Sequence, residues 1–170
     1  MIEYPNKILV ATDGTEDSAR AARLAAALAA RCGAELHAAH IWRPGAAETV
    51  TAAATRPPLP GEPPGYAERQ ARKLIGAEVR RIEEEGVPVT EAHLRAGQPA
   101  QALVALAAEL GADLLVVGSG RPRAVRRAGA AAARRPLLGK VADAVVRSAR
   151  CPVLVAHQEV FERSRGGREA

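Results

Sequence analysis

Short apolar runs, each followed by a segment with helical spacing, recur along this chain and restrict its fold more than any other feature. The clearest are Lys7–Thr12, Asp113–Val117 and Cys151–Ala156, in which apolar residues follow one another instead of alternating with polar ones. Such runs are typical of strands buried on both faces, as in parallel sheets. Parallel strands need long crossover connections, which the helical segments between the runs can supply.

The full order of elements predicts a doubly wound α/β domain. Two further strands are expected at Ala34–Trp42 and Val87–Arg95; the second alternates and starts beside Pro88, as expected near a sheet edge. Helices are expected at residues 15–31, Tyr66–Glu85, Pro99 to Glu109 or Leu110, and Lys140–Ser148. Strands and helices therefore alternate throughout, which predicts a five-stranded parallel sheet between two layers of helices, a three-layer α/β/α sandwich.

The predicted helices have identifiable ends and inward faces. Thr15 is placed to cap the first helix, Gly33 to end it, and Pro99 to begin the third. Residues expected to face the sheet recur at helical spacing. They are Ala21, Leu24, Ala25, Leu28 and Cys32 in the first helix, Ala67, Ala71, Leu74, Ile75, Val79 and Ile82 in the second, and Val141, Ala144 and Val145 in the fourth.

Length and composition fit one domain. We expect it to span residues 1–157 of the 170, with residues 158–170 forming a polar, disordered tail and the proline-rich residues 43–65 an irregular loop. No apolar run approaches the roughly 18 residues of a membrane span, and the N-terminus does not resemble a signal peptide. We therefore expect a cytoplasmic protein. Cys32 and Cys151 lack metal-ligand spacing and are expected to be small buried apolar residues.

The positive charge of the chain is concentrated in one segment. The formal net charge is +5, and seven of the 24 basic residues lie between Gly118 and Asp143 with no acidic residue among them. This segment is either a solvated insertion or a mobile lid whose guanidinium groups bind phosphate, with Arg134, Arg135 and Lys140 nearest the following helix. Because the charge is local and aromatic residues are only 2% of the chain, we expect neither a membrane partner nor a specific nucleic-acid partner.

A glycine turn joins the strand Asp113–Val117 to this basic segment. Gly118-Ser119-Gly120 directly follows the strand, and Gly139-Lys140 opens the next helix. A parallel strand that ends in glycine before a helix start can present backbone N–H groups to a phosphate. The same pattern can also be a simple strand-to-loop turn that needs positive φ.

Four pieces of the chain together resemble the universal stress protein family. They are KILVATDGTEDSARAA from Lys7, AAHIW ending at Trp42, ADLLVVGSG from Ala112, and LLGKVADAVVRSARCPVLV ending at Val155. The resemblance covers the chain from about Lys7 to His157. It implies a single domain of the adenine nucleotide α-hydrolase-like type with strand order 3-2-1-4-5. It also implies a stress-response protein that binds an adenine nucleotide, ATP, with or without Mg²⁺.

The resemblance also implies which residues bind the nucleotide. Carried over by position, Thr12 and Asp13 flank the nucleoside, and Ile41 offers its backbone N–H and C=O to adenine. The phosphate motif of the family is Gly, two residues, Gly, nine residues, Gly, then Ser or Thr. Its first part falls at the end of the fourth predicted strand, on Val117, Gly118 and Gly120. Its last part falls at the start of the next helix, on Gly139, Lys140 and Val141.

The motif is altered at three places. Gly118 and Gly139 are separated by 20 residues instead of 12. The second motif glycine is replaced by Arg121, or displaced to Gly120 or Gly129, and Lys140 replaces the hydroxyl residue. A protein that has lost nucleotide binding and acts through protein contacts is therefore an alternative. Family resemblance further implies a homodimer, formed through the exposed apolar edge of the last strand, Val153–Val155.

Catalytic and metal sites are not expected from the sequence. No Ser-His-Asp or paired-carboxylate arrangement stands out, so at most weak ATP hydrolysis is expected. The stretch Asp13–Ser18 partly resembles the pyrophosphate loop of ATP-pyrophosphatases, which adenylate their substrates, but lacks its Ser and second Gly. The four histidines, His37, His40, His93 and His157, do not cluster in the sequence, and the first two fall on opposite faces of a strand. We therefore predict no metal ligands.

Overall fold

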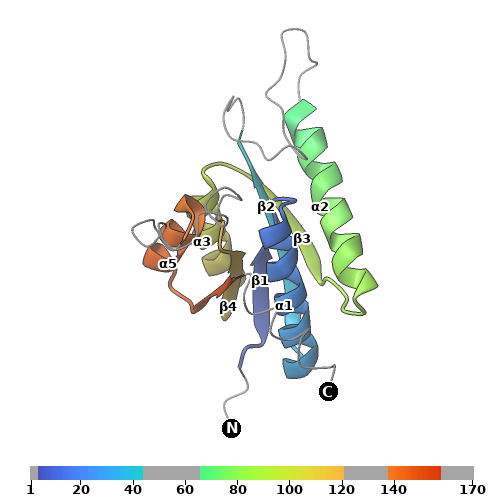
Figure 1. Ribbon diagram of the computed structural model, residues 1–170. Coiled ribbons are helices and arrows are strands. Elements are labelled where there is room, and N and C mark those ends of the chain that lie inside the picture. The colour runs from blue at the N-terminus through green and yellow to red at the C-terminus, as the bar shows by residue number, and fades with distance from the viewer. Residues whose placement is uncertain (1–3, 44–65, 121–137, 158–170) are drawn as a thin grey trace, which may run out of the picture.

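The computed structural model describes residues 4–43, 66–120 and 138–157, which form one sheet with helices on both faces (Figure 1). The strands are β1 (Lys7–Ala11), β2 (Glu35–Trp42), β3 (Glu91–Ala96), β4 (Leu114–Gly118) and β5 (Val153–Ala156). The helices are α1 (Glu16–Cys32), α2 (Tyr66–Glu84), α3 (Pro99–Leu110) and α5 (Lys140–Ser148). Among these helices, none combines the length and the apolar character needed to span a membrane.

All five strands are parallel and lie in the order β3-β2-β1-β4-β5, which confirms the predicted fold and strand order. The central strand β1 pairs on both sides, with Ile8 opposite Leu36 of β2 and Leu114 of β4. The edge strand β3 begins at Glu91, four residues later than predicted from Val87. Pro88 lacks a backbone N–H, and pairing with β2 begins at the Thr90 amide, which donates to the Leu36 carbonyl at 2.7 Å.

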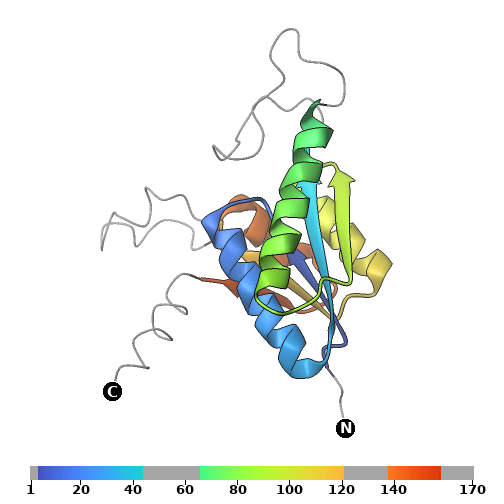
Figure 2. The ribbon, with the colours of Figure 1, turned by 90° about the vertical axis from the view of Figure 1, so that its right-hand side faces the viewer.

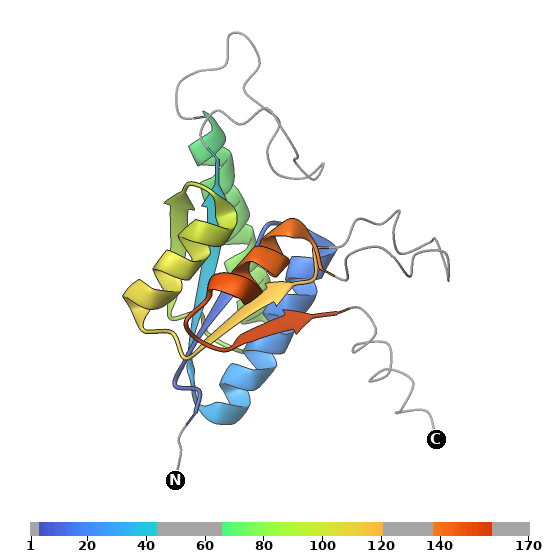
Figure 3. The ribbon, with the colours of Figure 1, turned by 90° about the vertical axis from the view of Figure 1, so that its left-hand side faces the viewer.

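Each face of the sheet carries its own apolar core. Helices α1 and α2 cover one face (Figure 2), and α3 and α5 cover the other (Figure 3). On the first face, five alanines of α1 pack against Ile8, Val10 and Leu36. On the second, Leu103 and Leu106 of α3 pack against side chains of β1 and β4. Small side chains on α1 let this helix approach the sheet closely, as expected of a core with few aromatic residues.

The predicted helix ends are confirmed. The Thr15 side chain caps α1 by accepting a hydrogen bond from the Ser18 amide at 3.2 Å. Gly33 ends this helix with a φ of 67°, in the left-handed region that glycine favours. Pro99 stands at the start of α3, and α5 begins at Lys140.

Several side chains depart from the predicted burial. Cys151, predicted to be buried, is partly exposed. Cys32 was predicted to be buried but is exposed. The buried face of α1 ends before Cys32; its alanines are Ala22, Ala26 and Ala29 together with the predicted Ala21 and Ala25. Val141 is also exposed, since α5 packs through Ala142 and Val145. Conversely, three charged side chains are buried although the sequence placed none of them in the core: Asp17 and Arg20 of α1 and Glu78 of α2.

Candidate functional site

The predicted nucleotide-binding residues lie together at the carboxyl ends of neighbouring strands. Thr12 and Asp13 follow β1, Ile41 is near the end of β2, and Val117 and Gly118 end β4. Gly139, Lys140 and Val141 form the start of α5 beside them. In doubly wound sheets, ligands bind in the crevice where the strand order reverses, which here is between β1 and β4.

Glycines hold the two ends of the basic segment together. The Gly139 amide donates to the Ser119 carbonyl at 2.8 Å, and the Ser119 amide donates to the Ala156 carbonyl of β5 at 3.1 Å. A Cβ atom on Gly139 would lie only 2.4 Å from the Gly120 carbonyl oxygen. The chain therefore leaves at Gly120 and returns at Gly139 to the same place.

Gly118 packs against the first turn of α1. A Cβ atom on Gly118 would lie 2.8 Å from the backbone C and O atoms of Asp17, so only glycine fits there. The Ser119 hydroxyl donates to Asp17 Oδ2 at 3.0 Å, and Arg20 donates to Asp17 Oδ1 at 2.5 Å. All three polar side chains are buried. This network fixes the glycine turn relative to α1.

Asp13 organises the turn that precedes α1. Its Oδ1 atom accepts hydrogen bonds from the amide and the hydroxyl of Thr15, at 2.9 and 2.5 Å. The Asp13 amide in turn donates to the Ser18 hydroxyl at 3.3 Å. Oδ1 of Asp13 therefore holds the turn before α1. The predicted position of Asp13 beside a nucleoside stays a prediction, and Oδ2 is the oxygen that this turn does not use.

The backbone of Ile41 points past the end of β1. In a parallel ladder, the N–H and C=O groups of one residue point to the same neighbouring strand, and alternate residues point to opposite sides. The Ala39 carbonyl accepts from the Thr12 amide on the β1 side, whereas the Trp42 carbonyl accepts from the Gly97 amide on the β3 side. Ile41, two residues after Ala39, therefore directs its N–H and C=O groups toward β1, which has already ended at Ala11.

The start of α5 supplies backbone donors. Gly139 is the N-cap residue and makes no side-chain capping hydrogen bond. The first amides of a helix have no partner within it, and they carry the positive end of the helix dipole. Lys140 and Val141 are both exposed at this end. The arrangement can accommodate a negatively charged group, with the Lys140 ammonium available as a further donor.

Two buried titratable groups lie under the site, between α2 and the sheet. His40 donates from Nδ1 to the Thr12 carbonyl at 2.8 Å, and burial lowers the pKa of this histidine. Burial also raises the pKa of Glu78, although its Oε1 atom accepts from Arg81 at 2.9 Å. Within the described parts of the chain, His40 Nε2 and Glu78 Oε2 have no hydrogen-bond partner. Both charged forms are therefore unfavourable here.

Several predicted features fall on residues whose structure is not described. They include the arginines of the possible lid, Arg134 and Arg135 among them, Arg121, the alternative motif glycine Gly129, the proline-rich stretch and the tail.

Comparisons with known proteins agree with the fold. The sequence profile of the Universal stress protein family matches residues 5–157. A Thermus aquaticus relative, the universal stress protein in QAH/OAS sulfhydrylase 3'region, is 35% identical over 87% of this chain and 96% of its own length. Bacillus subtilis universal stress protein YxiE is 30% identical over 88% and 97%. A solved universal stress protein in complex with cAMP is 28% identical, with a TM-score of 0.61, covering 89% of this chain and 96% of that one.

Proposed function

Since this chain belongs to the universal stress protein family, we propose that it binds an adenine nucleotide, ATP, at the carboxyl ends of β1 and β4, with little or no turnover. The observation that carries the proposal is the close packing of two glycines at the end of β4 and the start of α5. Gly118 fits closely against α1, and Gly139 meets Gly120 at the start of α5. The relative solved in complex with cAMP supports an adenine nucleotide as the ligand.

The phosphates are proposed to lie at the start of α5. The amides of Lys140 and Val141 donate to phosphate oxygens, and the exposed Lys140 ammonium takes the place of the hydroxyl found in the family motif. Mg²⁺, if it accompanies ATP, binds through the phosphates. Replacing a neutral hydroxyl donor with a cation keeps a donor at this position and adds a charge that favours phosphate.

The nucleoside is proposed to lie across the ends of β1 and β2. Asp13 Oδ2 accepts from the ribose, because Oδ1 is already bonded to Thr15. The N–H and C=O groups of Ile41 pair with the adenine edge beyond the end of β1. Thr12 and Val117 contribute backbone at the base of the site, and the exposed Val141 side chain covers the ligand from α5.

Isothermal titration of the full chain with ATP and Mg²⁺ tests this proposal. We expect saturable binding that Lys140→Ala weakens at least about tenfold, since a hydrogen bond to a charged group contributes roughly 1.5–3 kcal/mol. Arg147→Ala, on the last turn of the same helix, is the matched control and should bind ATP as the parent chain does. No heat at millimolar ATP, or an equal loss in both variants, would contradict the proposal.

The alternative, a protein that acts through protein contacts without a nucleotide, is favoured by the edge of the sheet. Strand β5 pairs with β4 alone, and Val153, Leu154 and Val155 are half-buried in the single chain. We propose that two chains pair through this edge to form a homodimer, which covers these side chains. Light scattering should show a dimer that Leu154→Lys converts to a monomer. A nucleotide that copurifies with the protein would exclude the nucleotide-free alternative.

The domain limits 1–157 and the cytoplasmic location expected from the sequence stay predictions.

A further inference from the structure

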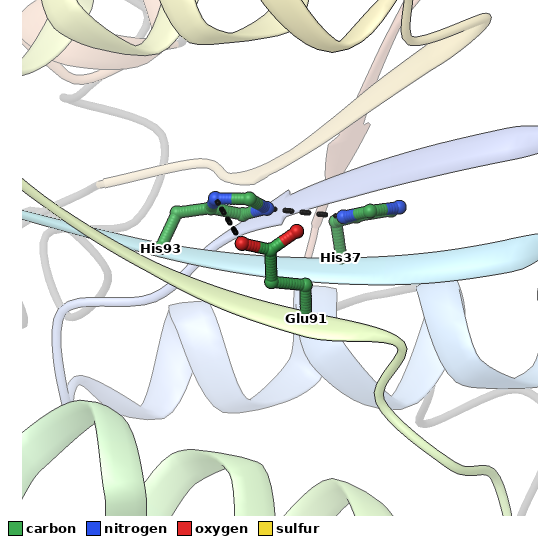
Figure 4. Close-up of side chains that lie close together, drawn as sticks. All are labelled: His37, Glu91 and His93. Carbon is green, nitrogen blue, oxygen red and sulfur yellow. Dashed lines mark hydrogen bonds and ion pairs between the residues drawn. The ribbon is translucent and has the colours of Figure 1, made fainter.

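Two histidines that are far apart in the sequence meet on the sheet face covered by α3. His37 of β2 and His93 of β3 are both buried, with 4% and 7% of their surfaces exposed. His37 Nδ1 lies 3.0 Å from His93 Nε2. The ring planes are 19° from parallel and the ring centroids are 5.3 Å apart. Figure 4 shows the two rings edge to edge, so the contact is a hydrogen bond between ring nitrogens.

The outer nitrogens of this pair face carboxylates. His37 Nε2 lies 3.5 Å from Glu35 Oε2, and His93 Nδ1 lies 3.8 Å from Glu91 Oε1. A neutral imidazole has one N–H group and one lone pair. If His37 donates to His93, the remaining His37 lone pair faces Glu35; if His93 donates, its remaining lone pair faces Glu91. Either neutral arrangement therefore directs a nitrogen lone pair at a carboxylate oxygen. A bound cation would remove the resulting repulsion.

Glu91 completes a set of three possible ligands. The ligand atoms that His37, Glu91 and His93 can offer all lie within 4.8 Å of one another. Glu91 stands opposite His37 in the strand register, two residues before His93, so all three side chains project from the same face. Its side chain is 62% exposed, which leaves the cluster open to solvent. Glu35, by contrast, is already paired with Lys7 at 3.5 Å.

We propose that His37, Glu91 and His93 bind a divalent transition metal ion of the Zn²⁺ class. Two imidazole nitrogens and one carboxylate oxygen are ligands that Zn²⁺ accepts, with a further position left for water or another donor. Two nitrogens bound tetrahedrally at about 2.1 Å from one ion are separated by roughly 3.4 Å. The observed 3.0 Å between the ring nitrogens is close to that separation, so a small rotation of the rings admits the ion.

The surrounding charges favour a cation. Beyond Glu35 and Lys7, the nearby Arg95 is paired with Glu109 of α3 at 3.2 Å. With Glu91, these groups comprise three carboxylates and two cationic side chains. His37 and Glu91 lie at the amino-terminal ends of β2 and β3, whereas the proposed nucleotide site is at the carboxyl ends of the strands. The metal site is therefore separate, and this inference does not rest on the nucleotide proposal.

Titration of the full chain with ZnCl₂ at pH 7.5, after removal of metal with EDTA, tests the assignment. We expect one ion per chain, and at least a 100-fold loss of affinity in His37→Asn and His93→Asn, because even outer partners of metal ligands change affinity 10–100-fold. Glu91→Gln should lose at least tenfold and is expected to fold, since its side chain is exposed. The matched controls are Glu83→Gln on the exposed face of α2, Cys32→Ser at the end of α1, and His157→Asn at the opposite edge of the sheet; all three should bind as the parent chain does.

Co²⁺ gives a second readout. Bound Co²⁺ should show visible d–d bands without a thiolate charge-transfer band, and Glu91→Gln should alter these bands. Failure of the parent chain to bind Zn²⁺ or Co²⁺ would overturn the proposal and leave a hydrogen-bonded histidine pair only. Weakening by Glu35→Gln but not by Glu91→Gln, or loss of binding in Cys32→Ser, would also overturn it.

Discussion

The two ends of this sheet are built by different means. At the carboxyl ends, short contiguous stretches with glycines bring backbone N–H and C=O groups together around the proposed nucleotide. At the amino-terminal ends of β2 and β3, side chains separated by more than fifty residues meet through strand pairing alone, as the 3.0 Å contact between His37 and His93 shows. A backbone site tolerates changes in side chains but not in geometry. A side-chain site has the opposite sensitivity.

Gly118→Ala should break the carboxyl-end site most severely. The new Cβ atom would lie 2.8 Å from the Asp17 backbone, which cannot move without shifting α1. We expect a loss of about 1–3 kcal/mol in the free energy of unfolding, together with loss of ATP binding. Chemical denaturation and titration calorimetry measure the two effects. Gly76→Ala is the control, because its Cβ would meet nothing nearer than 3.9 Å in the middle of α2; it should gain up to about 1 kcal/mol.

The carboxyl-end site depends on local backbone geometry, and this explains why the sequence could predict much of it. The alternation of strands and helices, the caps at Thr15 and Gly33, and the glycines of the turn all act through neighbours in the chain. They were therefore visible as local patterns, and the predicted fold is confirmed. The strand order, which was implied by the family resemblance and not by these patterns, is confirmed as well. The placement of Gly118 at the end of β4 and of Gly139 at the start of α5 followed from the same patterns.

Contacts between distant elements were not visible. The histidines were judged by their spacing in the sequence, whereas strand register places His93 opposite Ala39, two residues from His37. Glu78 occupies a buried position of α2 that periodicity would assign to an apolar residue, and its charge argued against burial. For Cys32 and Val141, helical spacing predicted the buried face of the helix with an error of one position. Both residues lie at a helix end and are exposed.

Ser119→Ala should sharpen the comparison by testing a side chain that supports the backbone site. It removes the hydroxyl that donates to Asp17 at 3.0 Å in a buried network. We expect a loss of about 1–2 kcal/mol in the free energy of unfolding, with a smaller effect on ATP affinity than that of Gly118→Ala. Denaturation with urea measures the first quantity. An unchanged stability would show that Ser119 contributes little to holding α1 against the turn.

Glu78→Gln should stabilise the protein at neutral pH. Burial raises the pKa of Glu78 above its ordinary value of 4.5, so the folded state holds this proton more tightly than the unfolded chain. Protonated Glu78 stabilises the folded state fully below pH 4.5, and this stabilisation is lost as pH rises through the pKa of Glu78 in the folded state. The glutamine variant should therefore gain about 1 kcal/mol at pH 8, and the gain should vanish near pH 4. Denaturation curves across this range measure it. Glu83→Gln, on the exposed face of α2, should change stability by less than about 0.5 kcal/mol at either pH.

The smallest effect is expected from His40, which tests whether histidines on the two faces of β2 behave differently. His40 is buried and donates to the Thr12 carbonyl, and burial lowers its pKa below the ordinary 6.5. As pH decreases, the unfolded chain therefore takes up a proton at His40 before the folded protein does. The free energy of unfolding falls as pH decreases through 6.5, by at most about 1.4 kcal/mol per pH unit.

His40→Asn keeps a side-chain donor for the Thr12 carbonyl but cannot titrate. Its denaturation midpoint should depend less on pH between 7.5 and 5.5 than that of the parent chain. An equal dependence in the His40 variant would mean that protonation near Thr12 is tolerated, and that the backbone of the proposed nucleotide site does not hold His40 in its neutral form.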